Sequence, residues 1–242
     1  MPRLFLLFLL LSSQIFAEIR QIFSMQEIIS EIDDNTLVVF DLDNTVIRPK
    51  NNLGSDQWYY YLVSRLGKKY KISRAEAHAK AEEIWNKTQL LIKTQAVESI
   101  TPNIIKAISG QVLALTARSH ECSQITRLQL ANIGVNFNTN YYSENFLKLD
   151  SKAYYNGGIL FQGEANNKGQ VLVEFLKQIN KKPQKILFID DKIKHVENMH
   201  KALEEWGGVT HIEYRYANTD HQVQAFNEDV ANAELYFDGE IN

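Results

Sequence analysis

Residues 37–46 have the sequence LVVFDLDNTV, and this stretch decides the fold. Four apolar residues, most of them typical of strands, are followed at once by Asp41 and Asp43. The stretch predicts a buried strand with two carboxylates at its carboxyl end, where the chain leaves the sheet. Crowded carboxylates repel one another, which predicts a shared proton or an oxygen-liganded divalent cation such as Mg²⁺ between them. The alternative is that Asp41, Asp43 and Asn44 only form a turn.

Two later segments also combine an apolar run with a polar end. The segment 111–116 ends in Thr116, and the segment 185–191 ends in Asp190 and Asp191. Helical patterns lie between these apolar runs. Strands that alternate with helices predict an α/β fold with a parallel central sheet covered by helices.

Three further elements are expected in the second half of the chain. Residues 154–161 predict a β-hairpin with Asn156-Gly157 as its turn, because this dipeptide favours the left-handed conformation that tight hairpins need. A fourth strand is expected at residues 209–214, and a last helix from about Gln222 to Leu235 is expected to pack on the outside.

The amino terminus has the pattern of a secretory signal peptide. Arg3 precedes a short apolar run over residues 4–11, and a small residue, Ala17, ends the segment. The apolar run is too short to span a bilayer comfortably. We therefore predict a signal peptide over residues 1–17, no membrane span after its removal, and a periplasmic or secreted protein. The alternatives are an uncleaved anchor or an ordinary buried helix.

Composition is that of a globular protein of one main domain, with 242 residues of which 45% are hydrophobic and 23% charged. Removing residues 1–17 takes Arg3 from the 26 basic residues and none of the 29 acidic ones, which leaves a net charge of −4. This charge argues against nucleic acid or an anionic membrane as the main partner. Cys122 is the only cysteine, so no intrachain disulfide is possible and core packing must stabilise the fold.

Residues 46–100 differ from the rest because no strand pattern interrupts them. A helix from Ser73 towards Ile92 and an aromatic cluster around Trp58 predict a helical insertion. The cluster would either face a substrate or pack a small core. We expect a core domain of residues 18–45 and 101–242, with residues 46–100 as a helical cap.

The polar strand ends predict one site, because ligands of open α/β sheets bind outside the carboxyl ends of the strands. A lysine at the start of a predicted helix can add positive charge there. Such a set fits phosphoryl transfer, in which positioned charges stabilise the transferred group and a carboxylate can act as nucleophile. Its members are Asp41, Asp43, Thr116, Lys168, Asp190 and Asp191.

The motifs resemble those of the haloacid dehalogenase (HAD) superfamily. Four occur in order, at residues 41–45, 113–116, 168 and 188–191, and the resemblance covers about residues 35–215. It implies a HAD-like, Rossmann-type three-layer sandwich with a small helical cap. It also implies a Mg²⁺-dependent phosphatase that hydrolyses a small phosphomonoester. The chain is similar, further, to uncharacterised secreted bacterial members of this superfamily.

The resemblance assigns a role to each matching residue. Asp41 resembles the nucleophile, and Asp43 resembles the general acid that later activates water. Thr116 would donate a hydrogen bond to a phosphate oxygen, and Lys168 would stabilise the phosphoaspartate. The Mg²⁺ ligands would be Asp41, Asp190, Asp191 and the backbone carbonyl of Asp43.

Other interpretations remain open. Thr116 could cap the following helix, Lys168 could be a solvated surface charge, and Asp190 with Asp191 could form a turn. Arg118 could bind a substrate anion, form an ion pair or face solvent. All six histidines are interpreted as surface or core residues. At the level of function, the alternatives are a HAD-fold binding protein without turnover and a phosphotransferase.

Overall fold

The computed structural model describes residues 17–108, 111–137, 141–163 and 167–239. The predicted signal peptide therefore lies outside the described residues, apart from Ala17, which begins the first strand. No helix in the described ranges is long and apolar enough to cross a bilayer.

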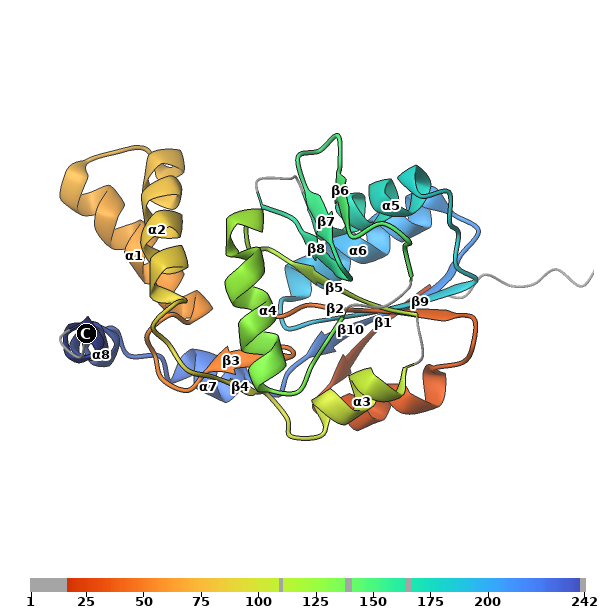
Figure 1. Cartoon of the computed structure of the whole chain (residues 1–242), viewed down its shortest axis with the longest axis horizontal. Coiled ribbons are helices and arrows are strands. Elements are labelled where there is room, and N and C mark those ends of the chain that lie inside the picture. Colours follow the sequence, from red (N-terminus) through yellow and green to blue (C-terminus); the bar gives the residue numbers. More distant parts are fainter. Residues whose placement is uncertain (1–16, 109–110, 138–140, 164–166, 240–242) are drawn as a thin grey trace, which may run out of the picture.

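A central sheet organises the described part of the chain (Figure 1). From β1 to β8 in the order of the sheet the strands pair in parallel, and β8, β7 and β6 pair antiparallel. This architecture confirms the predicted α/β class with a mostly parallel sheet. The eight strands lie in the order β1 (Ala17–Ile22), β10 (Thr210–Tyr216), β9 (Lys185–Asp190), β2 (Thr36–Phe40), β5 (Val112–Thr116), β8 (Ile159–Phe161), β7 (Tyr154–Asn156) and β6 (Phe146–Lys148).

The register of the central strands brings the polar residues to one edge. Phe40 of β2 is in register with Ala114 of β5 and with Ile189 of β9. Asp41 and Asp190 follow directly after Phe40 and Ile189, so they come level at the carboxyl edge of the sheet. The three strands thus end together, as the site prediction requires.

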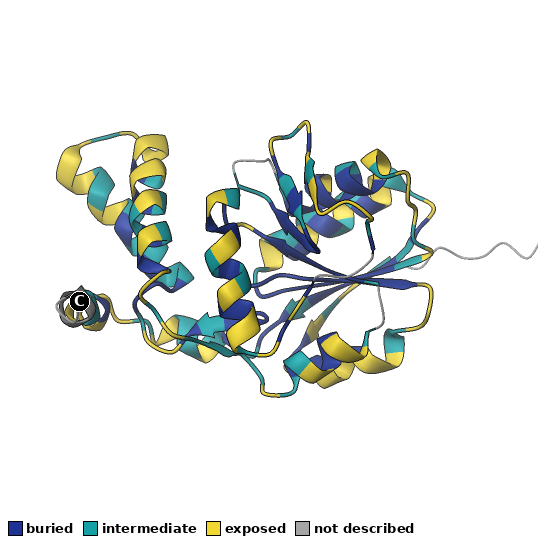
Figure 2. Cartoon of the chain, viewed as in Figure 1, coloured by how far each residue is buried: buried dark blue, intermediate teal, exposed yellow. Residues whose placement is uncertain are grey.

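Helices cover both faces of the sheet and make three layers (Figures 1 and 2). Alternation along β2 decides which side chain enters which core, because successive residues point to opposite faces. Val38 and Phe40 belong to one apolar core, and Leu37 and Val39 to the other. The first core is covered by η1 (Met25–Glu31), α3 (Thr101–Ala107) and α4 (Ser123–Asn132), and the second by α5 (Lys168–Gln178) and α6 (Ile193–Trp206).

The insertion predicted between the first two motifs contains a helical hairpin, which lies to one side of the sheet in Figure 1. Its helices are α1 (Asp56–Tyr70) and α2 (Arg74–Thr88). Contrary to the expectation of no strands, the hairpin is flanked by an antiparallel pair, β3 (Ile47–Pro49) and β4 (Thr94–Ala96). These strands are three residues long, too short for a periodic pattern to reveal them.

The carboxyl-terminal helix also packs against the hairpin. The expected single helix is two, α7 (Asp220–Gln224) and α8 (Glu228–Gly239). Ala231 of α8 joins Trp58 in a small apolar core, and Glu234 accepts a hydrogen bond from the Leu53 amide at 2.8 Å. The cap boundary at residues 46–100 remains our proposal, and α8 extends the cap in space.

The hairpin predicted at residues 154–161 forms as β7 and β8, but its turn lies one residue later than expected. Gly157 and Gly158 both have positive φ, at 47° and 88°. A Cβ on Gly158 would lie 1.5 Å from the carbonyl oxygen of Phe137, so this position excludes any other residue. The close backbone approach is a tertiary feature, and the dipeptide alone does not reveal it.

Candidate active site

Asp41 is the first residue after β2 and is buried. Its backbone amide donates to the Ile189 carbonyl at 2.8 Å, which extends the β2–β9 pairing by one residue. The Nζ atom of Lys168 contacts one carboxylate oxygen of Asp41, and the Thr45 hydroxyl lies 3.3 Å from the other. The backbone and both carboxylate oxygens of Asp41 are therefore held in place.

Lys168 is the first residue of α5 and is 1% exposed, so the surface interpretation of this lysine is wrong. Besides Asp41, its Nζ contacts Asp190 Oδ2 at 2.7 Å. One ammonium thus joins the carboxylates that end two neighbouring strands. Asn167 caps α5 by accepting from the Gln170 amide, which fixes the first turn that carries Lys168.

Asp190 and Asp191 end β9 side by side, but their contacts differ. Asp190 accepts from the Lys192 amide at 2.8 Å and lies 3.0 Å from Nδ1 of His195. The side-chain amide of Asn44 donates a hydrogen bond to Asp191 Oδ2 at 3.4 Å. His195 is a site residue that sequence reasoning placed on the surface or in the core. His195 lies at the site because the first turn of α6 packs over Asp190. No local pattern in the sequence indicates this packing.

Asn44 has a φ of 63°, in the left-handed region. Asparagine tolerates this conformation better than most residues with a side chain, and glycine tolerates it best. The side chain also donates to Asp191 across the site. The residues after β2 therefore do form a turn, as the alternative interpretation expected. This turn also orients Asp41 and Asn44 within the candidate site, so the two interpretations are compatible.

The charges at the strand ends are not balanced. Burial, followed by the neighbouring Asp190, raises the pKa of Asp41 to about 6 against the opposing effect of Lys168. Burial and the carboxylates of Asp190 and Asp41 raise the pKa of Asp191 well above its usual value. Burial also opposes ionisation of Asp190, but Lys168 and His195 outweigh it and hold its pKa well below the usual range. Three carboxylates lie together here, and the Lys168 ammonium contacts only Asp41 and Asp190, so an additional cation would stabilise the group.

The donor set fits a hard divalent cation. Carboxylate oxygens of Asp41, Asp190 and Asp191 all lie within 4.8 Å of one another. Oxygen ligands of this kind are the ones that Mg²⁺ prefers. Among the described residues, the Asp43 side chain does not belong to this group.

Asp43 instead forms a two-point ion pair with Arg118. The Nε and Nη2 atoms of Arg118 donate to the two Asp43 oxygens at 2.8 and 2.7 Å. Although burial opposes ionisation, Arg118 lowers the pKa of Asp43. Arg118 is itself held by Thr126 and Gln129, whose side-chain oxygens lie 3.0 and 2.8 Å from Nη1. Of the three interpretations of Arg118, the structure therefore favours the ion pair.

Thr116 ends β5 and is completely buried. Its hydroxyl accepts from the Arg118 amide at 3.2 Å. The helical segments that follow begin after Ser119 and Cys122, so Thr116 does not cap them. Its hydroxyl oxygen orients the turn that carries Arg118.

A cavity of about 440 Å³ lies between the cap and the strand ends. The core contributes Asp43, Arg118, Lys192 and His195 to its wall, and the cap contributes Asp56, Tyr59, Tyr60, Glu82 and Trp85. Lys192 joins the two sides through a 2.7 Å contact with Asp56. Within the predicted aromatic cluster, Trp58 packs in the small apolar core, while Tyr59 and Tyr60 line the cavity.

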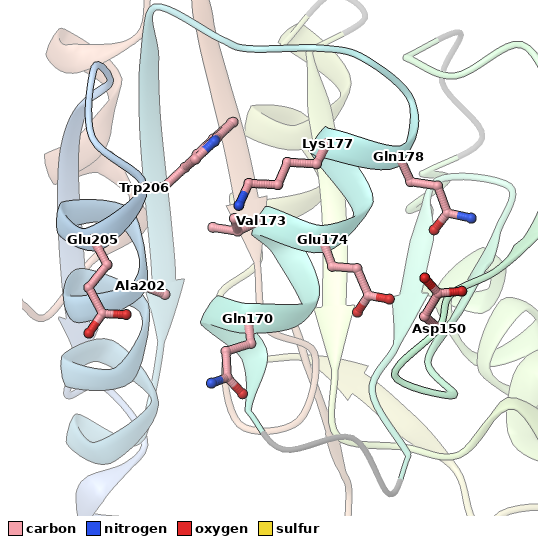
Figure 3. Close-up of a pocket in the computed structure, with 9 residues that line it drawn as sticks. All are labelled: Asp150, Gln170, Val173, Glu174, Lys177, Gln178, Ala202, Glu205 and Trp206. Atoms are coloured by element: carbon pink, nitrogen blue, oxygen red, sulfur yellow. The ribbon is translucent and has the colours of Figure 1, made fainter.

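A larger groove of about 660 Å³ lies between α5 and α6 (Figure 3). Figure 3 shows Lys177 and Trp206 on opposite sides of it, with Glu174 and Asp150 together at one end. None of the predicted site residues lines this groove. Its residues come from outer helix surfaces rather than from the strand ends, so it is not the candidate active site.

Comparison with known proteins identifies sequence relatives and solved structures to which the chain is similar. The chain is 29% identical over 195 residues to an uncharacterised protein of Rickettsia prowazekii, covering 74% of this chain and 69% of the relative. It is 27% identical over 197 residues to a Chlamydia trachomatis protein named "Putative outer membrane protein", covering 78% and 74%. Among solved structures it is similar to a haloacid dehalogenase-like hydrolase of Streptococcus pneumoniae, with 11% identity, a TM-score of 0.45, and coverage of 81% of this chain and 100% of that chain.

One family model covers nearly all of the described chain. It matches residues 18–240, from the second residue of β1 to just beyond α8. The chain therefore belongs to the family described as "Protein of unknown function (DUF2608)".

Proposed function

We propose that this protein is a Mg²⁺-dependent phosphatase that hydrolyses a small phosphomonoester through a phospho-Asp41 intermediate. One observation carries the proposal. Asp41 and Asp190 contact a single buried ammonium, that of Lys168, at the carboxyl ends of two adjacent strands, and Asp191 lies close enough to both carboxylates to share a metal ion with them. Phosphoryl transfer needs such an arrangement, because it depends mainly on positioning and on stabilisation of charge.

In the first step, an Asp41 oxygen would attack phosphorus, and the bond from phosphorus to the alcohol oxygen would break. Lys168 holds the Asp41 carboxylate and would offset the charge of the acyl phosphate. The Thr116 hydroxyl, at the end of the neighbouring strand, would donate to a phosphoryl oxygen. Bound Mg²⁺ would supply positive charge beside the transferred group, with Asp41, Asp190, Asp191 and the Asp43 carbonyl as its ligands.

Asp43 would give a proton to the leaving alcohol and later take one from the attacking water. Arg118 pairs with both oxygens of Asp43 and, against the effect of burial, lowers its pKa. To act as an acid, Asp43 must first gain a proton and loosen its contact with Arg118. Substrate that enters the cavity would trigger this change, because Asp43 and Arg118 both line the cavity wall.

The Arg118–Asp43 pair also favours one alternative. A protein that keeps Asp43 permanently paired would bind a phosphorylated ligand without turning it over. Phosphotransfer to an acceptor other than water is the other alternative, and the product distinguishes it from hydrolysis.

The location we propose is the cell envelope or the exterior, supported by the predicted signal peptide and by the name of the Chlamydia relative.

Hydrolysis of an aryl phosphate by the chain without residues 1–17 tests the proposal. We expect phosphate release that needs Mg²⁺, stops with a chelator and is absent in Asp41→Asn. The variant is nearly isosteric, so its thermal unfolding should match that of the wild type. Release that persists in a folded Asp41→Asn would refute the mechanism. Binding of phosphate esters without release would support the binding-protein alternative.

A further inference from the structure

A second group of buried, metal-ligating side chains lies between β10 and α6. His211 and Glu213 are two residues apart on β10, so both point to the same face of the sheet. His200 projects from α6, which packs on that face. Nδ1 of His200 lies 2.6 Å from Glu213 Oε2, and Nδ1 of His211 lies 2.8 Å from Glu213 Oε1. The three side chains therefore meet around one carboxylate.

This group is separate from the candidate active site. Glu213 is in register with Phe188, two residues before the Asp190 that ends β9. None of the three side chains lines the cavity beneath the cap. The active-site histidine, His195, lies five residues before His200 on α6, so the two histidines serve different groups.

The donor atoms differ from those of the phosphate site. One ligand atom from each of His200, His211 and Glu213 can be chosen so that all lie within 4.8 Å of one another. Two imidazole nitrogens and one carboxylate oxygen form a set that suits Zn²⁺, whereas Mg²⁺ prefers oxygen alone. We propose that His200, His211 and Glu213 bind a zinc-class transition-metal ion, with a fourth position left for water or another ligand.

Burial and a neighbouring carboxylate support this proposal. Glu213 is fully buried and His211 is 1% exposed, while the His200 side chain is 22% exposed and gives an ion access from solvent. Nε2 of His200 faces Glu204 at 3.5 Å. A metal-binding histidine commonly directs its second nitrogen to a carboxylate, which orients the ring.

Proton placement follows from the contacts. Nδ1 of each ring faces a Glu213 oxygen, so a metal ion bound at Nδ1 requires a neutral ring whose single proton is on Nε2. For His200 that proton would point to Glu204. The bound ion would join α6 to β10, the strand next to the edge strand β1, and would add to the stability of the folded state.

Cobalt is the probe that separates the two sites. Four-coordinate Co²⁺ with nitrogen ligands absorbs visible light strongly, and six-coordinate Co²⁺ with oxygen ligands absorbs weakly. We would titrate the chain without residues 1–17 with Co²⁺ in the presence of excess Mg²⁺. We expect an intense visible band that saturates at one equivalent and disappears when Zn²⁺ is added.

Matched variants make the result specific. His200→Asn keeps a donor for Glu213 but removes the imidazole, and we expect it to lose the band while keeping its circular dichroism. His221→Asn changes an exposed histidine of α7 and should keep the band. Glu204→Gln should weaken Co²⁺ binding about 10- to 100-fold without abolishing it. A wild type without the intense band, or a band unchanged in His200→Asn, would overturn the proposal.

Discussion

The two walls of the cavity are built in different ways. On the core side, Asp41, Lys168 and Asp190 lie next to the residues that line the cavity, are buried, and each contacts at least two other groups. On the cap side, Tyr60 is 49% exposed and Tyr59 is half-buried, with its hydroxyl 2.9 Å from Nδ1 of His78. The core wall is therefore suited to hold reacting groups in fixed positions. The cap wall is suited to select the leaving group.

After Asp41, whose replacement should abolish release, the largest effect on turnover should come from Asp43. We expect Asp43→Asn to lower steady-state turnover by about 10²–10⁴-fold, the usual range for loss of a general acid and base. Because an aryl leaving group needs little protonation, one equivalent should still be released in a burst. Stopped-flow absorbance measures the burst. Unchanged turnover would remove Asp43 from the mechanism.

Lys168 tests whether the core wall depends on a buried cation. Lys168→Met leaves Asp41 and Asp190 buried without their partner, and we expect the free energy of unfolding to fall by about 3–5 kcal/mol. Lys192→Met removes a partly exposed ion pair and should cost no more than about 1 kcal/mol. Urea unfolding of both variants provides the comparison. Equal losses would contradict the claim that the core side depends on a buried cation.

Arg118 tests the position of Asp43. Arg118→Gln should lower turnover by about 10- to 100-fold, because the Asp43 carboxylate is no longer held in place. The affinity for Mg²⁺ should change little, since Arg118 contacts none of Asp41, Asp190 and Asp191. Steady-state kinetics with a parallel Mg²⁺ titration measures both. A rise in turnover would mean that the ion pair inhibits the enzyme.

The smallest effect should come from the cap. Glu82 lines the cavity, whereas Glu83, the next residue, forms an exposed ion pair with Lys87. Glu82→Gln should change KM by about two- to fivefold for substrates with a charged leaving group and leave kcat unchanged. Glu83→Gln should change neither. A large loss of kcat in Glu82→Gln would assign the chemistry partly to the cap.

The difference between the core side and the cap side of the site also explains which features could be predicted from the sequence. The strands β2, β5 and β9 are continuous apolar runs, and their polar ends are visible in the sequence. Local patterns of this kind are enough to locate the core wall. The strand β1 and the β3–β4 pair were missed, because short or edge strands carry little periodic signal.

The residues that were missed or left open act through tertiary contacts. His195 reaches Asp190 from the first turn of α6, and Arg118 reaches Asp43 across 75 positions of sequence. Helical spacing does not link His200 with His211, because His200 lies on α6 and His211 lies on β10. Spacing within one element does not reveal partners on another.

The central claim is that Asp41 becomes phosphorylated, and intact mass spectrometry tests it most directly. Asp43→Asn, mixed with an aryl phosphate and Mg²⁺ and quenched in acid, should gain the mass of one phosphoryl group, located by peptide mapping on Asp41. The double variant Asp41→Asn/Asp43→Asn should gain none. Catalytic release of the aryl alcohol by Asp43→Asn without phosphorylated protein at any quench time, or a phosphoryl group on another residue, would contradict the account.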